Sequence, residues 1–374
     1  MINTIETIET RRSRRQFLRV ALAGATTGAA TGPGSACGVP PSARTPAVAP
    51  SPAGSPPASP PAAPKPATVK WGSTGSDGPL FIAQAKGYFA EQGITLDLNV
   101  FATSTQMIAP LSQNQLQAGG GAVGAGLFNA IGRGIGIRIA GDRGNFSPGH
   151  GTQGILVRTP LAQQITGPAD LKGRTYADAA ADTAGEVNLD AYLRKGGLTI
   201  KDVSLVPLPF PDMQAALESG RVDVAQPIEP WLTRIVESGA AKQLVRYDEV
   251  VPGQQNAVLL FSEQFARERD AAVRFMVAYL KGARFYNDAF DKNDSPKRAE
   301  AVDILAAAMN LDRTLVDKMV KAGIHPDGRV NLEAIAADQQ YFLAKGSQEK
   351  PIDLQAVVDM SFAEEAVRIL GPYR

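Results

Sequence analysis

The chain has 374 residues, enough for one large domain or two modest ones, with 38 basic and 37 acidic residues. The charge is uneven, because residues 1–67 hold seven of the basic and two of the acidic residues, which leaves a formal −4 on the remainder. A slightly acidic domain without a basic run argues against nucleic acid and an anionic membrane surface as partners. The single cysteine, Cys37, excludes a disulfide within the chain.

The first 37 residues are predicted to form an export signal. Residues 13–19, SRRQFLR, resemble the twin-arginine motif, with Arg19 as a departure because lysine is commoner there. A glycine- and alanine-rich apolar run, residues 20–36, follows at once, as such signals require. This run is too short and too rich in glycine for a good membrane span. The alternative is a basic, disordered N-terminus.

Cys37 stands at the end of this run, in a sequence that resembles a lipoprotein cleavage site, although Gly34 replaces the usual leucine. We therefore predict a lipid anchor at Cys37, with ordinary cleavage near Ala36 and a soluble product as the alternative. Residues 38–67 contain 11 prolines among alanine and serine, a composition that favours extended polyproline II over a packed core. At ~3.1 Å per residue, this tether would reach roughly 90 Å.

The folded part begins with alternating strands and helices. Strands are predicted at 68–72, 94–100 and 135–140, with a helix from Pro79 to Gly93 after the first. The loops that leave these strands are small and polar, and Asp77, Ser76 or Ser104 can cap the helices that follow. The glycine run 119–122 is predicted as a further exit loop, and 142–151 as an irregular loop that contains Arg143, Phe146 and His150.

The second half repeats this pattern. Strands are predicted at 154–158, 175–177, 203–208, 222–224 and 257–261, with helical periodicity from residue 262 to the end. Thr183 and Glu186 have the spacing of a capping box, which favours a structural role for Glu186. Residues 226–231 leave a strand and enter a helix at Pro230, so Glu229 and Trp231 lie where ligands bind in open α/β sheets.

In this order the motifs resemble the nitrate/sulfonate/taurine and pyrimidine-precursor family of substrate-binding proteins of ABC importers, over about residues 69–372. The segments that carry the resemblance are Pro79–Leu80, Gly87–Phe89, Asp170–Gly173, Pro211–Asp223 and Glu229–Trp231, with Val358–Phe362 near the end. Departures are Gln115–Gln117, where the family often has a Gly-x-x-Asp turn, and Gln226–Pro227, where an aromatic residue is common before the Glu-Pro.

The resemblance implies a two-lobed type II periplasmic-binding-protein fold with a hinged cleft. One lobe would comprise residues 68–167 plus 250–374, and the other residues 168–249. The loops at the cleft would supply the ligand-binding residues, which we predict to be Ser73, Thr74, Asp77, Thr103, Ser104, Ala122, Phe146, Asp182, Thr183, Glu229 and Trp231.

The function implied is capture of a small polar organic solute outside the cytoplasm and its delivery to a membrane permease. The protein would be a monomer without cofactor or metal, in the periplasm or on the outer face of the cytoplasmic membrane. A ligand-sensing module that signals to a partner protein is the alternative. An enzyme related to pyrimidine-precursor synthases is disfavoured, because the two histidines and the leader cysteine form no metal-binding cluster.

The ligand class depends on charge. Asp77, Asp182 and Glu229 are predicted near the cleft with only Arg143 as a fixed cation, so we expect Glu229 to select an amine or another hydrogen-bond donor. A taurine-like zwitterion fits this arrangement. Stacking of a pyrimidine-like ring on Trp231 or Phe146 is the alternative for the ligand, and core packing is the alternative role for Trp231.

Overall fold

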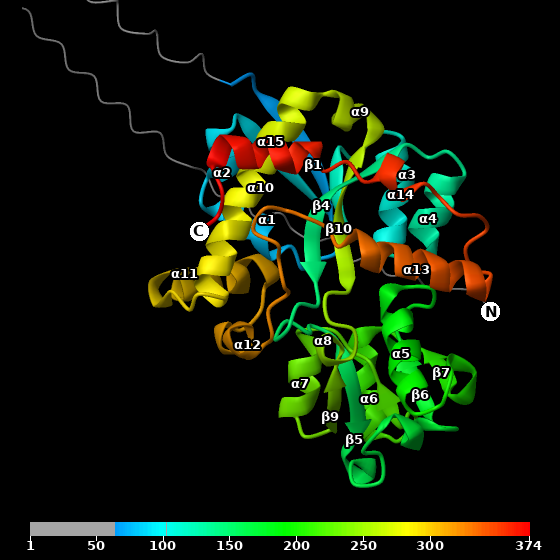
Figure 1. The fold of residues 1–374 in the computed structure, drawn as a ribbon. Coiled ribbons are helices and arrows are strands. Elements are labelled where there is room, and N and C mark those ends of the chain that lie inside the picture. Colours follow the sequence, from blue (N-terminus) through cyan, green and yellow to red (C-terminus); the bar gives the residue numbers. More distant parts are fainter. Residues whose placement is uncertain (1–63, 102) are drawn as a thin grey trace, which may run out of the picture. The chain divides into compact units, whose positions relative to one another are not determined.

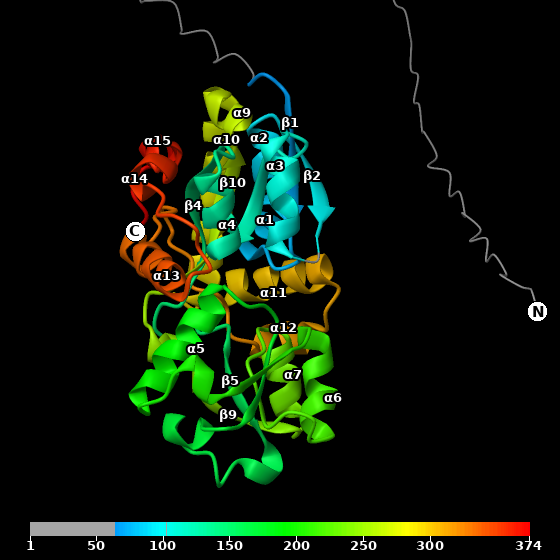
Figure 2. The ribbon, with the colours of Figure 1, turned by 90° about the vertical axis from the view of Figure 1, so that its right-hand side faces the viewer.

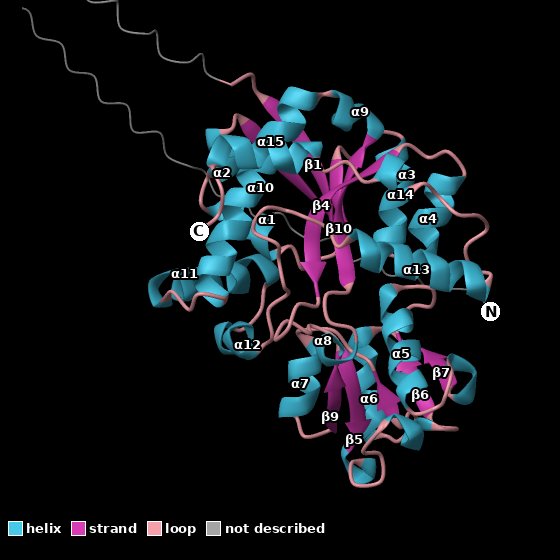
Figure 3. Ribbon diagram, viewed as in Figure 1, coloured by secondary structure: helices cyan, strands magenta, loops and turns pink. Residues whose placement is uncertain are grey.

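The structure is a computed structural model that describes residues 64–101 and 103–374. The predicted export signal, Cys37 and most of the tether therefore lie outside the described residues. Ten strands form two five-stranded sheets within this part of the chain (Figures 1 and 3). The strands are β1 (Ala67–Ser73), β2 (Ile94–Val100), β3 (Ala118–Ala122), β4 (Ile137–Asn145), β5 (Gly154–Arg158), β6 (Thr175–Asp178), β7 (Ser204–Pro207), β8 (Val224–Ala225), β9 (Ala241–Arg246) and β10 (Gln255–Ser262).

The first sheet has the order β2-β1-β3-β10-β4. β1 pairs in parallel with β2 and β3, whereas β10 is antiparallel to both β3 and β4. The carboxyl ends of β1, β2, β3 and β4 therefore lie along one edge. In sheets of this kind that edge is where ligands bind.

The second sheet has the order β7-β6-β8-β5-β9, with β6 parallel to β7 and β8. β5 pairs antiparallel with β8 and β9, so residues 154–158 belong to this sheet and not to the first lobe, where the sequence analysis placed them. The chain crosses between the sheets after β4 and again before β10. β9 was not predicted, because a polar edge strand lacks clear alternation.

Fifteen α-helices cover the sheets in the described residues. They are α1 (Gly78–Ala85), α2 (Tyr88–Glu91), α3 (Ile108–Ser112), α4 (Ala125–Gly132), α5 (Ala184–Lys195), α6 (Met213–Glu218), α7 (Trp231–Glu237), α8 (Tyr247–Val250), α9 (Glu263–Arg267), α10 (Arg269–Phe290), α11 (Ser295–Met309), α12 (Arg313–Lys318), α13 (Leu332–Lys345), α14 (Leu354–Val357) and α15 (Ser361–Leu370). No helix among these described residues is long and apolar enough to span a membrane.

The longest helix, α10, packs its apolar face against the first sheet. Phe275 of α10 stacks on Trp71 of β1 with ring centroids 5.7 Å apart, and it also contacts Phe261 of β10. Offset and edge-to-face ring pairs of this kind contribute ~0.5–1.5 kcal/mol each beyond the area they bury. This core fixes the strands whose carboxyl ends carry the predicted site.

The second sheet has a core on each face. Tyr176 and Val224 face α5 and α8, whereas Leu156 and Ala177 face α6 and α7. Phe146 is fully buried in the first of these cores, with its ring centroid 6.4 Å from that of Tyr247. The expectation that Phe146 stacks on a ligand is therefore wrong, because its ring has no exposed face.

The glycine run 119–122 was expected to be a loop, but all of it lies within β3 in the middle of the first sheet. Small side chains are required here, because a Cβ at Gly119 would lie 3.2 Å from the carbonyl oxygen of Gly72 on β1. The predicted helix 79–93 is likewise divided into α1 and α2 at Gly87, whose φ of +74° is a left-handed conformation that favours glycine.

Candidate functional site

Three of the predicted loops meet at the edges of the two sheets. The hydroxyl of Ser104 accepts a hydrogen bond of 3.0 Å from the backbone N–H of Ala122, which joins two loops of the first sheet. The backbone N–H of Ala125 donates to the carbonyl of Asp182 at 3.0 Å, and Gly124 forms an isolated β-bridge with Thr183. Loop 122–125 of the first sheet is therefore in direct contact with loop 182–184 of the second.

The loop after β1 is organised around Asp77 and Arg143. One oxygen of the buried Asp77 carboxylate accepts from Nε of Arg143, and the other accepts from the hydroxyl of Ser73. The Arg143 Nη2 group lies 3.3 Å from the Thr74 hydroxyl and 3.4 Å from that of Ser76. We call Asp77, Arg143, Thr74 and Ser76 the Arg143 cluster.

Asp77 does not cap α1 with its side chain, although it occupies the N-cap position. The carboxylate is instead turned toward Arg143, which comes from β4 and reaches across the sheet edge. Gly120 of β3 makes room for this path, because a Cβ there would overlap with Nε of Arg143. Arg143 and Gly120, both outside the list of expected ligand residues, thus shape this end of the site.

Asp182 is held by a different cation, Lys345 at the end of α13. Its carboxylate lies 2.8 Å from Nζ of Lys345, which also contacts the fully buried carboxylate of Glu186. Burial opposes protonation of this lysine, but its hydrogen bonds to the two carboxylates raise its pKa. The expected capping box is shifted by one residue, since Glu186 accepts from the backbone N–H of Asp182 at 2.9 Å. In both ribbon views α13 lies beside the start of α5 (Figures 1 and 2).

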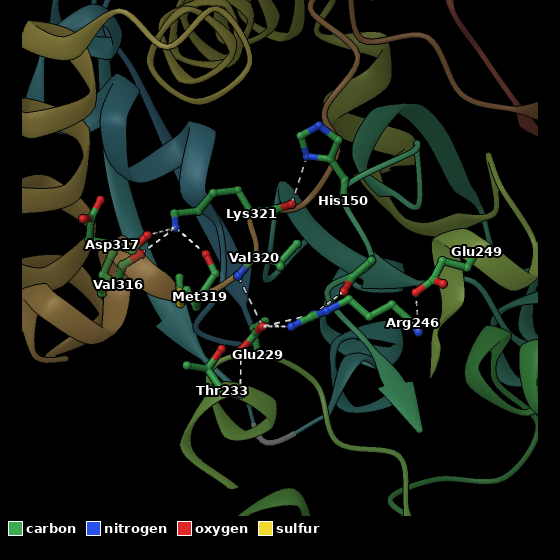
Figure 4. Close-up of polar contacts among 11 residues, drawn as sticks. His150, Glu229, Thr233, Arg246, Glu249, Val316, Asp317, Met319, Val320 and Lys321 are labelled. Carbon is green, nitrogen blue, oxygen red and sulfur yellow. Dashed lines mark hydrogen bonds and ion pairs between the residues drawn. The ribbon is translucent and has the colours of Figure 1, made fainter. Parts of the chain in front are cut away.

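Glu229 has both of its carboxylate oxygens occupied (Figure 4). One oxygen accepts from Arg246 at 3.2 and 3.3 Å and from the backbone N–H of Val320 at 3.2 Å. The other accepts from the backbone N–H of Thr233 at 3.1 Å. We call these four residues the Glu229 cluster. The side chain of Glu229 is only 4% exposed, so this structure does not support its expected role as an amine selector.

Val320 belongs to a segment between α12 and α13 that contacts both sheets. The carbonyl of its neighbour Lys321 lies 3.1 Å from Nδ1 of His150, in the segment that crosses between the sheets (Figure 4). Gly323 forms an isolated bridge with Asn145 at the end of β4. Residues 320–323 therefore connect the first sheet, the crossing segment and the second sheet.

The remaining predicted residues lie at the same edges with fewer constraints. Thr103 is exposed, Thr183 is half-buried and donates to the carbonyl of Ala180 at 3.3 Å, and Ser73 is buried. Trp231 is half-buried at the first position of α7, with the Arg234 guanidinium 4.9 Å from its ring centroid. Trp231 is not among the residues of either core of the second sheet, so the alternative of core packing is not supported.

Each of the three carboxylates expected near the site has a cation beside it. These are Arg143 for Asp77, Arg246 for Glu229, and Lys345 for Asp182, with Lys345 shared between Asp182 and Glu186. Arg246 and Lys345 carry no local motif that would have revealed these pairings. An anionic ligand would therefore not face these three carboxylates unpaired.

Two surface hollows of about 460 and 450 Å³ lie elsewhere on the first sheet's side. Glu263 and Arg267 of α9 line both of them, together with side chains near α14 or α3. Neither hollow includes a predicted site residue. The converging loops, and not these hollows, are thus the candidate site.

Two sheets, each with its own helices and joined where the chain crosses between them, define the class of two-lobed α/β binding proteins. The NMT1/THI5-like family model matches residues 76–289, more than half of the chain. The chain therefore belongs to the NMT1/THI5-like family.

Relatives and solved structures agree with this class. A Bacillus subtilis (strain 168) protein, whose name refers to aliphatic sulfonate binding, is 28% identical over 77% of this chain and 85% of its own length. The alkanesulfonate-binding protein SsuA from Xanthomonas axonopodis pv. citri, solved with MOPS, has a TM-score of 0.64 at 20% identity, covering 79% of this chain and 99% of that one.

Two further structures with this fold differ in function. The periplasmic nitrate-binding protein NrtA from Synechocystis PCC 6803 has a TM-score of 0.63 at 15% identity and covers 83% of this chain and 90% of that one. The desulfurization enzyme DszB, solved as a mutant in complex with biphenyl-2-sulfinic acid, has a TM-score of 0.57 at 20% identity, with 81% and 99% covered. At these identities the likeness establishes the fold and not the ligand.

Proposed function

We propose that this protein is the extracytoplasmic solute-binding component of an ABC importer and captures a small polar organic solute, with an aliphatic sulfonate as the favoured class. The observation that carries the proposal is the meeting of loops 122–125 and 182–184 at the facing edges of two sheets. A solute held between such loops would be enclosed when the lobes approach, and binding would shift the protein toward that arrangement.

The ligand class follows from the pairing of charges. Because Asp77, Asp182 and Glu229 are each paired with a cation, they do not by themselves select a cationic ligand, and the name of the Bacillus subtilis relative supports a sulfonate. A taurine-like zwitterion remains within this class. Trp231, half-buried beside Arg234, supports a pyrimidine-like solute as the second candidate, because an aromatic ring can stack on a heterocycle.

Thermal unfolding of residues 64–374 in the presence of single solutes tests the proposal. A ligand that binds only the folded state at 100 times its Kd adds ~2.7 kcal/mol to stability, which is readily seen as a rise in Tm. The panel would contain ethanesulfonate, taurine, nitrate and a 4-aminopyrimidine, with inorganic sulfate as a control for non-specific salt effects. A panel without any stabilising solute would contradict the proposal.

Catalysis is not part of the proposal, although the structure of a desulfurization enzyme has the same fold. Residues 64–374 contain no cysteine to act as a nucleophile, and the described residues contain no group of three or more His, Cys, Asp or Glu that could hold a metal. Incubation of a bound solute with the purified protein, followed by mass spectrometry, would reveal any turnover. A sensing role would be distinguished by capture of a signalling partner in place of a permease.

The proposed function also includes an export route and a membrane anchor. We infer export through the twin-arginine route, lipid attachment at Cys37 and a periplasmic or membrane-surface location, because the motif, the cysteine and the proline-rich tether occur in that order. Mass spectrometry of the mature N-terminus checks the anchor directly. A Cys37→Ala variant should then be released from the membrane fraction, while an Arg14→Lys, Arg15→Lys pair should block export.

A further inference from the structure

We propose that the guanidinium of Arg143 binds the anionic head of the solute, and that Asp77 serves as the positioning residue that aims it. This inference rests on the proposed function and assigns the sulfonate end of the ligand to the first lobe. The Nε side and the Nη end of the Arg143 guanidinium differ in their hydrogen-bond partners.

The Nε side of Arg143 is committed to the fold. Nε donates to the Asp77 carboxylate, whose other oxygen is held by Ser73 and lies 3.4 Å from the indole nitrogen of Trp71. Asp77 and Ser73 are each 2% exposed. A carboxylate fixed from both sides in this way gives the guanidinium one orientation, which is the preorganisation that a binding site requires.

The far end of the guanidinium is not committed in the same way. Nη2 has only the two hydroxyl oxygens of Thr74 and Ser76 at 3.3 and 3.4 Å, which are long for charge-assisted hydrogen bonds. Nη1 has no hydrogen-bond partner among the described residues. The Nη1/Nη2 edge can donate to two oxygens of a planar or tetrahedral anion, so these donors of Arg143 are available to a ligand.

Burial makes these donors stronger. The Arg143 side chain is only 9% exposed, so its interactions are less screened by water than those of a surface arginine. The adjoining loop becomes exposed at Gly75 and Ser76, which leaves an approach to the guanidinium from that side. The hydroxyls of Thr74 and Ser76 accept from Arg143 and keep their own hydrogens to donate to an anionic oxygen.

The negative charge of Asp77 does not prevent an anion from binding to Arg143. Its charge balances that of Arg143 in the free protein, so the guanidinium can be buried without an unpaired charge. The ion pair uses Nε and leaves the Nη1/Nη2 edge of the guanidinium for a ligand. The absence of a side chain at Gly120 leaves room for the guanidinium against β3. A sulfonate or carboxylate head matches this end geometrically, whereas an uncharged group of the same size would gain far less.

The test compares ethanesulfonate with ethanesulfonamide, which has nearly the same shape but no charge. Arg143→Gln alone would leave Asp77 buried without its partner, so the main variant is the double substitution R143Q/D77N, which replaces the ion pair by two amides. Arg138→Gln is the matched control, since Arg138 lies on the same strand and donates to the carbonyl of Ala356 at the surface. Calorimetry gives the affinities, and circular dichroism confirms folding.

We expect the unaltered protein and R138Q to bind ethanesulfonate with equal affinity, and R143Q/D77N to lose roughly tenfold to hundredfold, because hydrogen bonds to a charged group are among the strongest in proteins. Affinity for ethanesulfonamide should be low throughout. Equal ethanesulfonate affinity in R143Q/D77N and the unaltered protein would overturn the inference. Failure of the unaltered protein to bind ethanesulfonate while it binds another solute of the panel would also overturn it, but would leave the solute-binding function standing.

Discussion

The Arg143 cluster and the Glu229 cluster contain the same kind of ion pair in different surroundings. In the Glu229 cluster the carboxylate accepts from Arg246, Thr233 and Val320, and Arg246 also donates to the carbonyl of Gly151 at 2.7 Å. In the Arg143 cluster both carboxylate oxygens also have donors, but Arg143 reaches the carboxylate through Nε, and Nη1 at the end of its guanidinium has no partner among the described residues.

This difference distinguishes a cluster that can bind a ligand from one that stabilises the fold. In the Glu229 cluster both Nη groups of Arg246 donate to the carboxylate, so the end of the guanidinium is used within the fold, and the pair joins the second sheet to the segment before α13. A pair whose cation keeps free donors is already oriented and can receive a ligand. The two clusters should therefore respond differently when each is altered: changes in the Glu229 cluster should lower stability, and changes in the Arg143 cluster should lower affinity for an anion.

Glu229→Ala should have the largest effect on stability. It leaves the half-buried Arg246 and the N–H of Val320 without their acceptor, and removal of one partner of a largely buried pair typically costs ~3–5 kcal/mol. Urea unfolding measures the loss. Glu229→Gln, which keeps an acceptor, should lose less and should change the affinities for taurine and ethanesulfonate by the same factor. A selective loss of taurine binding would show that Glu229 reads the amine after all.

Gly120→Ala should damage the Arg143 cluster with a smaller cost in stability. The added methyl group displaces the Arg143 side chain, and overpacking of this kind costs ~1–3 kcal/mol. Ethanesulfonate affinity should fall with it. Gly144→Ala on β4 is the matched control, because its Cβ would lie 3.8 Å from the nearest atom, the Cβ of Ala257. Equal ethanesulfonate affinity in both variants would argue against a site at Arg143.

Lys321 should make the region of the Glu229 cluster sensitive to alkaline pH. Burial lowers the pKa of Lys321 to about 8, and its ammonium group donates to the carbonyls of Val316 and Met319. Between about pH 8 and the ordinary lysine pKa of ~10.4, the unfolded chain binds a proton that the folded protein has released, so stability rises with pH.

The gain is at most about 3 kcal/mol, since each pKa unit corresponds to ~1.4 kcal/mol. Unfolding free energies measured from pH 7 to 10.5 should therefore rise more steeply in the unaltered protein than in Lys321→Met. Parallel curves would contradict the assignment.

Glu237→Gln should have the smallest effect. Glu237 of α7 lies 2.6 Å from Lys318 of α12, with both side chains about half exposed. Solvent-exposed pairs of this kind contribute little, so the unfolding midpoint should not change measurably. A clear loss would mean that this surface contact, and not the Glu229 cluster, carries the connection between α7 and α12.

The sequence predicted local elements better than their pairings. The alternation in residues 94–100 and the apolar start of β1 predict strands, because side chains that alternate between faces are visible in one segment. β3 escaped prediction because glycines have no side chain to alternate, and its place in the sheet is decided by β1 and β10.

The contacts of the site residues could likewise not be predicted from local sequence. Strand exits placed Asp77, Asp182 and Glu229 near one another, but their cations lie 66, 163 and 17 residues away along the chain. Such pairings depend on tertiary packing, and no local pattern encodes them. The prediction for Phe146 was wrong for a related reason. An aromatic residue near glycines and a proline resembles part of a binding loop, but in the structure the core of the second sheet encloses it.

The strand order also bears on the sequence of events during synthesis. All five strands of the second sheet lie between residues 154 and 246, so this sheet can pair as soon as β9 has left the ribosome. The first sheet lacks β10, which lies between β3 and β4, until residue 262 has been made. Only then is β4 held in register beside β10, so that the side chain of Arg143 can lie over Gly120 of β3. The first lobe begins earlier along the chain, yet the anion-binding end of the site is the part that a growing chain would complete late.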